Sequence, residues 1–202
     1  AMSGRFHAVG LFFGHHLFAG NRVSKSSSWA FEGFSAPSTG PLARTGTPWH
    51  WYADDSAAVG CGWRSPKPYE RHDVAVIDMV PGISAARLDA MLTPRPEAVL
   101  LRAYGVGNVP SDEPGLTDVI ADVLHDGVPV IIASQCQQAE VLLGHYETGD
   151  AIARAGAIGS GDMTLEAAYA KIMFLLSQGV TGSHFGKWLT LPIAGEISPS
   201  SL

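Results

Sequence analysis

The sequence predicts an α/β fold, in which residues 73–202 form a three-layer domain with a Rossmann- or flavodoxin-like parallel sheet. Residues 1–72 are predicted to form a separate segment that contains a β-hairpin. After residue 73, short and nearly continuous apolar runs alternate with amphipathic runs. Strands that are apolar on both faces are typical of a parallel sheet covered by helices on both sides. Residues 1–72 are instead rich in Gly, Ser, Pro and Trp, and they show little helical periodicity.

The apolar runs predict the strands of the sheet, and the amphipathic runs predict the helices that connect and cover them. The predicted strands are residues 74–80, 98–103 and 128–134, and the predicted helices are residues 84–92, 116–124 and 164–178. The last helix is the clearest, because its apolar residues recur at helical spacing. Asp162 or Thr164 can cap its N-terminus, and Glu166 suits the positive end of its dipole. A long polar loop is expected before this helix.

The N-terminal segment shows strand and loop patterns but no amphipathic helix. The predicted hairpin comprises residues 7–13 and 17–23, with its turn at residues 14–16. Residues 31–37 are predicted to be a loop, and the alternation of Trp49, Trp51 and Tyr52 with polar residues is compatible with a strand. Residues 65–68 contain two prolines and are predicted to connect the two parts of the chain.

Composition excludes several classes of protein. The chain has 202 residues, a net charge of −6 and no run of Lys and Arg, which argues against a nucleic-acid partner. It has two cysteines and no CxxC pair, so neither a disulfide framework nor a zinc site is expected. No apolar run approaches the roughly 18 residues of a membrane span, and residues 1–5 have no signal-peptide core. We therefore expect a cytoplasmic protein without a membrane partner.

Polar residues follow two of the predicted strands. Arg102 lies at the end of one strand with Asn108 just beyond it, and Ser134 ends the next strand with Cys136 just beyond it. Because ligands of open parallel sheets bind beyond the carboxyl ends of the strands, we expect these side chains to converge. A guanidinium can hold a carboxylate with two hydrogen bonds, so the set suits an amino acid better than a phosphate. The alternative is that Arg102 forms a structural salt bridge and that Cys136 is an inert loop thiol.

Three other features carry weaker signals. The glycine-rich run of residues 156–161 precedes a helix and suits an anion, but it lacks the Walker lysine and the GxGxxG order, which favours a turn. His15 and His16 are adjacent near a hairpin turn, where a metal pair is not expected. By residue pattern alone, Lys25 is more typical of a solvated lysine than of a functional one.

Seven motifs occur along the sequence in a defined order. They are residues 20–25, 31–37, 80–84, 102–108, 134–136, 145–149 and 156–166. Motifs of these types in this order resemble the cytoplasmic, type I bacterial L-asparaginases. The resemblance runs from about His7 to Ser198.

The resemblance implies hydrolysis of asparagine to aspartate and ammonia without a cofactor or a metal. It assigns Lys25 as a catalytic residue, which would shuttle a proton or orient a hydroxyl. Asn108 matches an asparagine that contributes to the substrate pocket of a neighbouring subunit. The resemblance therefore also implies a homo-oligomer, either a dimer or a dimer of dimers.

Type I enzymes can carry a separate allosteric site for asparagine, and the resemblance assigns four residues to it. Arg102 matches the arginine of that site. Ser134 and Cys136 match a Thr-x-Cys motif in which serine replaces threonine. Ser24 stands where a threonine precedes the catalytic lysine. Both replacements keep the hydroxyl group, so the hydrogen bonds of such a site could be retained.

One part of the family pattern is absent. The Thr-Gly-Gly-Thr motif, which carries the threonine nucleophile, and a Thr-Asp pair belong upstream of Lys25, and no Thr-Gly-Gly-Thr occurs in the 202 residues. Residues 1–72 are accordingly expected to be a remnant of the N-terminal asparaginase domain, and residues 73–202 the C-terminal domain. Three functions stay open: an incomplete L-asparaginase, a non-catalytic asparagine-binding module and a dimerisation module.

Overall fold

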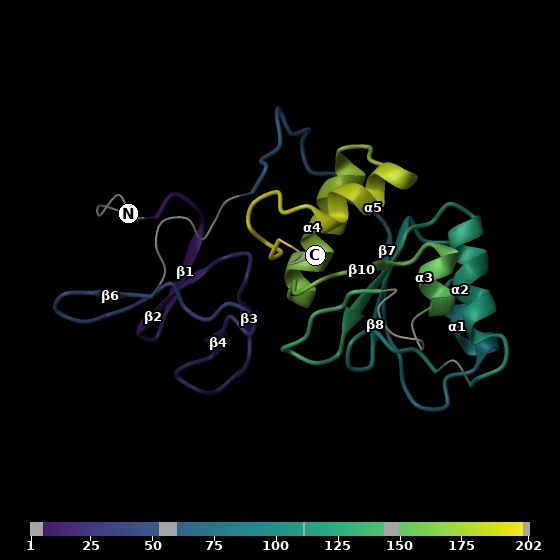
Figure 1. The fold of residues 1–202 in the computed structure, drawn as a ribbon, viewed down its shortest axis with the longest axis horizontal. Helices are drawn as coiled ribbons and strands as arrows, with labels where there is room; N and C mark the ends of the chain where they lie inside the picture. The colour runs from purple at the N-terminus through teal and green to yellow at the C-terminus, as the bar shows by residue number, and fades with distance from the viewer. Residues whose placement is uncertain (1–5, 53–59, 111, 144–149, 200–202) are drawn as a thin grey trace.

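A computed structural model describes residues 6–52, 60–110, 112–143 and 150–199 of the chain (Figure 1). A parallel sheet forms the centre of the C-terminal part, with strand order β10-β9-β8-β7. Its strands are β7 (Val74–Asp78), β8 (Ala98–Ala103), β9 (Val130–Ser134) and β10 (Ile158–Gly159). Each neighbouring pair is parallel. The predicted parallel α/β fold is therefore confirmed.

Helices cover both faces of this sheet. One core contains apolar side chains of α1 (Ala85–Met91), α2 (Leu116–His125) and α3 (Asp150–Ala155). The other contains those of α4 (Leu165–Ser177) and α5 (Ser183–Thr190). Successive strand residues alternate between the cores, so that Leu101 faces the first and Leu100 the second. The strand order never reverses, which places the three connecting helices together on one face (Figure 1).

The helix ends follow from their capping residues. The Thr164 hydroxyl accepts a hydrogen bond from the Ala167 N–H at 3.1 Å, and α4 begins at the next residue, as predicted. The Ser84 hydroxyl caps α1 in the same way, 3.2 Å from the Arg87 nitrogen. The prediction of a continuous polar loop before α4 is wrong, because α3 and β10 lie within it. Helix α5 was not predicted.

The N-terminal part forms two small antiparallel sheets. The first has the order β1-β2-β5-β6 and consists of β1 (Gly10–Phe13), β2 (His16–Ala19), β5 (Ala43–Arg44) and β6 (His50–Trp51). The second pairs β3 (Ser24–Lys25) with β4 (Phe34–Ser35). The predicted hairpin is present with shorter strands. The predicted loop of residues 31–37 is wrong in part, because Phe34 and Ser35 pair with the strand that carries Lys25.

Among the described residues, no helix is both long enough and apolar enough to cross a membrane. The segment after α5 runs back toward the N-terminal sheets, so that it and α4 lie between the two parts of the chain (Figure 1).

Candidate functional site

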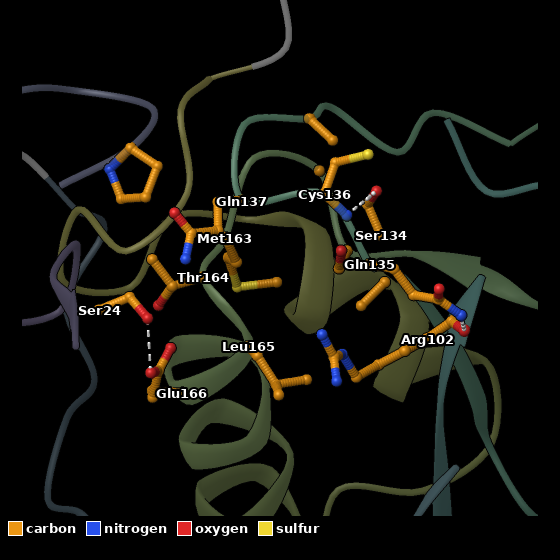
Figure 2. A pocket seen from close by; sticks show the side chains of 15 residues that line it. Ser24, Arg102, Ser134, Gln135, Cys136, Gln137, Met163, Thr164, Leu165 and Glu166 are labelled. Atoms are coloured by element: carbon orange, nitrogen blue, oxygen red, sulfur yellow. Dashed lines mark hydrogen bonds between the residues drawn. The ribbon is translucent and has the colours of Figure 1, made fainter. Parts of the chain in front are cut away.

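A small cavity lies beyond the carboxyl ends of β8 and β9, at the N-terminus of α4 (Figure 2). Its volume is about 130 Å³. An apolar cavity of about 150 Å³ can hold benzene, so this one suits a molecule of similar size. The residues that line it come from distant segments of the chain: Ser24 and Pro37, Arg102, residues 133–137 and 139, and residues 160, 161 and 163–166. All four residues assigned to a ligand by the resemblance, Ser24, Arg102, Ser134 and Cys136, are among them.

Arg102 is the cation of the cavity. Its Nη1 lies 2.8 Å from Oδ1 of Asp78, which is one strand away at the matching register position. The Arg102 Nε is buried without a hydrogen-bond partner among the described residues. The structural salt bridge is thus present, and the same side chain lines the cavity.

Ser134 shapes the turn that follows β9. Its hydroxyl donates a hydrogen bond to the Gly105 carbonyl at 2.5 Å and accepts one from the Cys136 N–H at 3.0 Å. Gln135 ties the strand ends together, because its amide donates to the carbonyls of Met79 and Arg102 at 2.6 and 2.9 Å. The Cys136 thiol is exposed and forms no disulfide. These bonds fix the backbone on which Ser134 and Cys136 face the cavity.

The opposite wall joins the N-terminal part to α4. The Ser24 hydroxyl donates a 2.7 Å hydrogen bond to Glu166 Oε1 (Figure 2). Ser160 and Thr164, which also line the cavity, are buried. The sequence had indicated Glu166 only as a helix-dipole partner and Thr164 only as a cap. The sequence signal that could have indicated both as site residues is their position near the start of a helix that follows a glycine-rich run.

Lys25 and Asn108 do not line the cavity. Ser24 and Lys25 are adjacent in β3, so their side chains leave opposite faces of the strand. The Lys25 Nζ lies 4.6 Å from the centre of the Phe34 ring. Asn108 closes a tight turn in which its backbone exchanges hydrogen bonds with Tyr104 at 2.8 and 2.9 Å. The predicted convergence of Asn108 with Arg102 in one cavity is therefore not seen.

The remaining sequence features add no second site among the described residues. Residues 156–161 form a turn and strand β10, and Ser160 and Gly161 line the cavity. His15 pairs with Thr45 at 3.3 Å. No group of three or more His, Cys, Asp or Glu side chains in the described part of the chain is arranged to hold a metal ion. The motif at residues 145–149 lies outside the described residues.

Comparisons with known proteins find similarity over nearly the whole chain. The family model described as Glutaminase/Asparaginase C-terminal domain matches residues 73–189, and the one described as Asparaginase, N-terminal matches residues 1–57. L-asparaginase 1 of Escherichia coli is 34% identical over 191 residues, which are 95% of this chain and 56% of the relative. The crystal structure of L-asparaginase I from Vibrio cholerae has a TM-score of 0.83 at 34% identity, over 94% of this chain and 57% of the other.

The human 60 kDa lysophospholipase is also similar, with 33% identity over 196 residues that make up 96% of this chain and 34% of the relative. The chain thus spans a little over half the length of the bacterial relatives. The resemblance to the asparaginases, inferred from ordered motifs, is confirmed by these matches. The chain belongs to the glutaminase/asparaginase family.

Proposed function

We propose that this chain is part of an L-asparaginase, contributing Lys25 to the hydrolysis of asparagine and a cavity that binds asparagine. The supporting observation is the cavity itself. Ser24, Arg102, Ser134 and Cys136 come from segments far apart in the sequence, yet the fold brings all four to one small space. The similarity to L-asparaginase 1 of E. coli, which covers 95% of the chain, supports the same proposal.

The chemistry of the cavity fits an amino acid. The Arg102 guanidinium would take the α-carboxylate of the ligand, in competition with Asp78. Glu166 supplies a carboxylate for the ammonium group at the far wall, 2.7 Å from the Ser24 hydroxyl. The hydroxyls of Ser24 and Ser134 already donate to Glu166 and to the Gly105 carbonyl, so each can accept a hydrogen bond from the N–H of a side-chain amide. A cation and an anion on opposite walls match the two charged ends of a zwitterion.

Hydrolysis would use Lys25 on the other face of β3. Its amine would orient a hydroxyl or shuttle its proton during attack on the substrate amide. The threonine nucleophile of the family motif is not among the 202 residues. We therefore expect no ammonia release from the 202-residue chain by itself. Asn108 would serve a neighbouring subunit in a cytoplasmic dimer or dimer of dimers.

A chimaera tests the catalytic part of the proposal. It joins the portion of E. coli L-asparaginase 1 that has no counterpart here to residues 1–202. We expect the chimaera to release ammonia from asparagine. Lys25→Ala should lower kcat by about 10² to 10⁴, the range of general acid–base catalysis. Lys187→Ala, at an exposed lysine of α5, is the matched control and should retain activity.

A folded chimaera without ammonia release, or equal rates for the two variants, would reject a catalytic role for this chain.

The binding module is the second candidate. The observation that favours it is that the cavity is complete within these residues, whereas the nucleophile motif is not. In this case the 202-residue chain would bind asparagine and the chimaera would be inactive.

A further inference from the structure

Arg22 is a buried charged residue in the N-terminal part of the chain, and its contacts lie in the C-terminal part. Its side chain is 7% exposed. Nε donates a hydrogen bond to the Gly195 carbonyl at 2.7 Å, and Nη2 donates one to Ser198 Oγ at 3.2 Å. Nη1 lies 2.9 Å from Asp162 Oδ2 as an ion pair, without the geometry of a hydrogen bond. All three nitrogens of the guanidinium thus contact residues at least 140 positions away in the sequence.

Asp162 is the centre of the same cluster. Its Oδ1 accepts a hydrogen bond from the Ser198 N–H at 2.8 Å, and its Oδ2 accepts one from the Ser198 hydroxyl at 2.6 Å. Burial raises the pKa of Asp162, but the hydrogen bonds from Ser198 and the charge of Arg22 outweigh it and hold the pKa below its ordinary value. The carboxylate is therefore charged at neutral pH and matches the buried guanidinium.

The segment that Arg22 contacts is fixed to α4 by independent bonds. Lys171 of α4 is 3% exposed and forms a 2.6 Å ion pair with Glu196, which is 8% exposed. The Lys171 ammonium also donates to the Leu191 carbonyl at 2.6 Å. Glu196 accepts the backbone N–H groups of Ile193 and Ala194. Arg22 therefore contacts a segment that other bonds hold against α4.

This cluster lies beside both walls of the cavity. Ser24 and Lys25 follow Arg22 in the sequence by two and three residues. Asp162 lies between Gly161 and Met163, which both line the cavity, and Glu166 follows one helical turn later. The Ser24–Glu166 hydrogen bond spans the two elements that the cluster joins. A displacement of Arg22 relative to Asp162 would change the distance across the cavity.

We propose that Arg22, Asp162 and Ser198 form a positioning clamp that holds β3 in place against the N-terminus of α4. The clamp sets the position of Ser24 in the cavity and the direction in which Lys25 leaves the strand. Its consequence for ligand binding rests on the proposed function. The clamp itself rests only on the contacts described above.

The test uses the 202-residue chain and two readouts. Hydrogen–deuterium exchange reports how firmly β3 is held, and calorimetry reports the Kd for L-asparagine. We expect Asp162→Asn and Arg22→Gln to raise the exchange rate of the Ser24–Lys25 segment at least tenfold while β8 stays protected. The Kd should rise about tenfold. Arg22→Lys keeps the charge but not the three nitrogens of the guanidinium. Its exchange rate and its Kd should therefore lie between those of the wild type and those of Arg22→Gln.

Controls and a milder variant keep the test decisive. Arg44→Gln and Asp118→Asn change exposed residues outside the clamp and should leave both readouts unchanged. If Asp162→Asn does not fold, Ser198→Ala removes the shared hydroxyl without leaving a buried charge, and should show the same two effects in weaker form.

Failure of the clamp proposal and failure of the asparagine-binding proposal give different results. The exchange is measured under conditions well below the unfolding midpoint. If the variants lower that midpoint but β3 exchanges at the wild-type rate, the cluster only stabilises the fold, and the clamp proposal is wrong. If the wild-type chain binds no asparagine, the binding proposal fails, and the exchange measurements still decide the clamp.

Discussion

The two parts of the chain differ in how completely they bury their strands. In the parallel sheet, Leu100 and Leu101 face opposite cores and are 0% and 1% exposed. In the N-terminal hairpin, Phe12 and Phe13 are also neighbours on opposite faces, but they are 50% and 39% exposed. Six of the eight exposed aromatic side chains in the described part of the chain lie within residues 6–52, which carry the two antiparallel sheets. They are Phe12, Phe13, Trp29, Phe31, Trp49 and Tyr52.

The difference indicates which part is self-sufficient. Apolar residues on both faces of a strand are typical of an inner layer, and the C-terminal sheet has a helical layer on each side. The N-terminal sheet has the same two-sided apolar pattern without two covering layers. A further apolar groove of about 560 Å³ lies between that sheet and α4, lined among others by Val9, Val23 and Phe174. Exposed surfaces of this type mark interaction sites. The C-terminal part should therefore dominate the stability of the chain.

The largest expected effect compares two phenylalanines. Phe185 of α5 is 1% exposed and Phe12 of β1 is 50% exposed. Phe185→Ala should lower the free energy of unfolding by about 3–5 kcal/mol, because it leaves a cavity in the core. Phe12→Ala should change it by roughly 0.5 kcal/mol, as at other surface sites. Urea unfolding followed by circular dichroism measures both. Similar losses for the two variants would contradict the contrast between the two sheets.

A smaller set of changes tests the junction between the parts. Glu196→Gln leaves the buried Lys171 ammonium without its carboxylate and should cost about 3 kcal/mol. The matched change in an exposed pair is Asp126→Asn, which removes one of the two carboxylates that pair with Arg95 and should cost about 0–1 kcal/mol. The midpoints of urea unfolding measure the cost of each change. An equal cost would mean that the Lys171–Glu196 pair is solvated in solution.

The smallest effect is the pH dependence of the same junction. The pKa of Asp162 and that of Glu196 are both lowered from ordinary values of 3.8 and 4.5, because hydrogen bonds and the facing cations outweigh burial. A carboxyl group with a lower pKa in the folded state stabilises the fold above its unfolded pKa. Stability should therefore be lost as the pH falls below about 4.5 and through the folded-state values. Asp162→Asn should flatten this profile in unfolding curves taken between pH 3 and 7, and an unchanged slope would contradict the assignment.

Much of the fold could be predicted from the sequence, because strands such as residues 98–103 are apolar throughout and α4 has a clear helical period. The paired strands β3 and β4 were missed because two residues show no periodicity. Helix α5 was missed because Gly186 interrupts a short sequence with few apolar positions.

Part of the candidate site could also be predicted from local sequence patterns. The rule that ligands bind beyond strand ends identified Arg102 and Ser134. Glu166 and the clamp residue Asp162 were missed as site residues because their partners, Ser24 and Arg22, lie about 140 residues away in the sequence. Only the packing of the N-terminal part against α4 brings these pairs together.

The measurement that tests the central claim most directly is isothermal calorimetry of the 202-residue chain with L-asparagine. The cavity predicts saturable binding of one asparagine per chain, weakened at least tenfold by Arg102→Ala and unchanged by Arg87→Ala, which alters an exposed arginine of α1. A folded chain that shows no saturable binding of asparagine, or that binds it equally well after Arg102→Ala, would contradict the account.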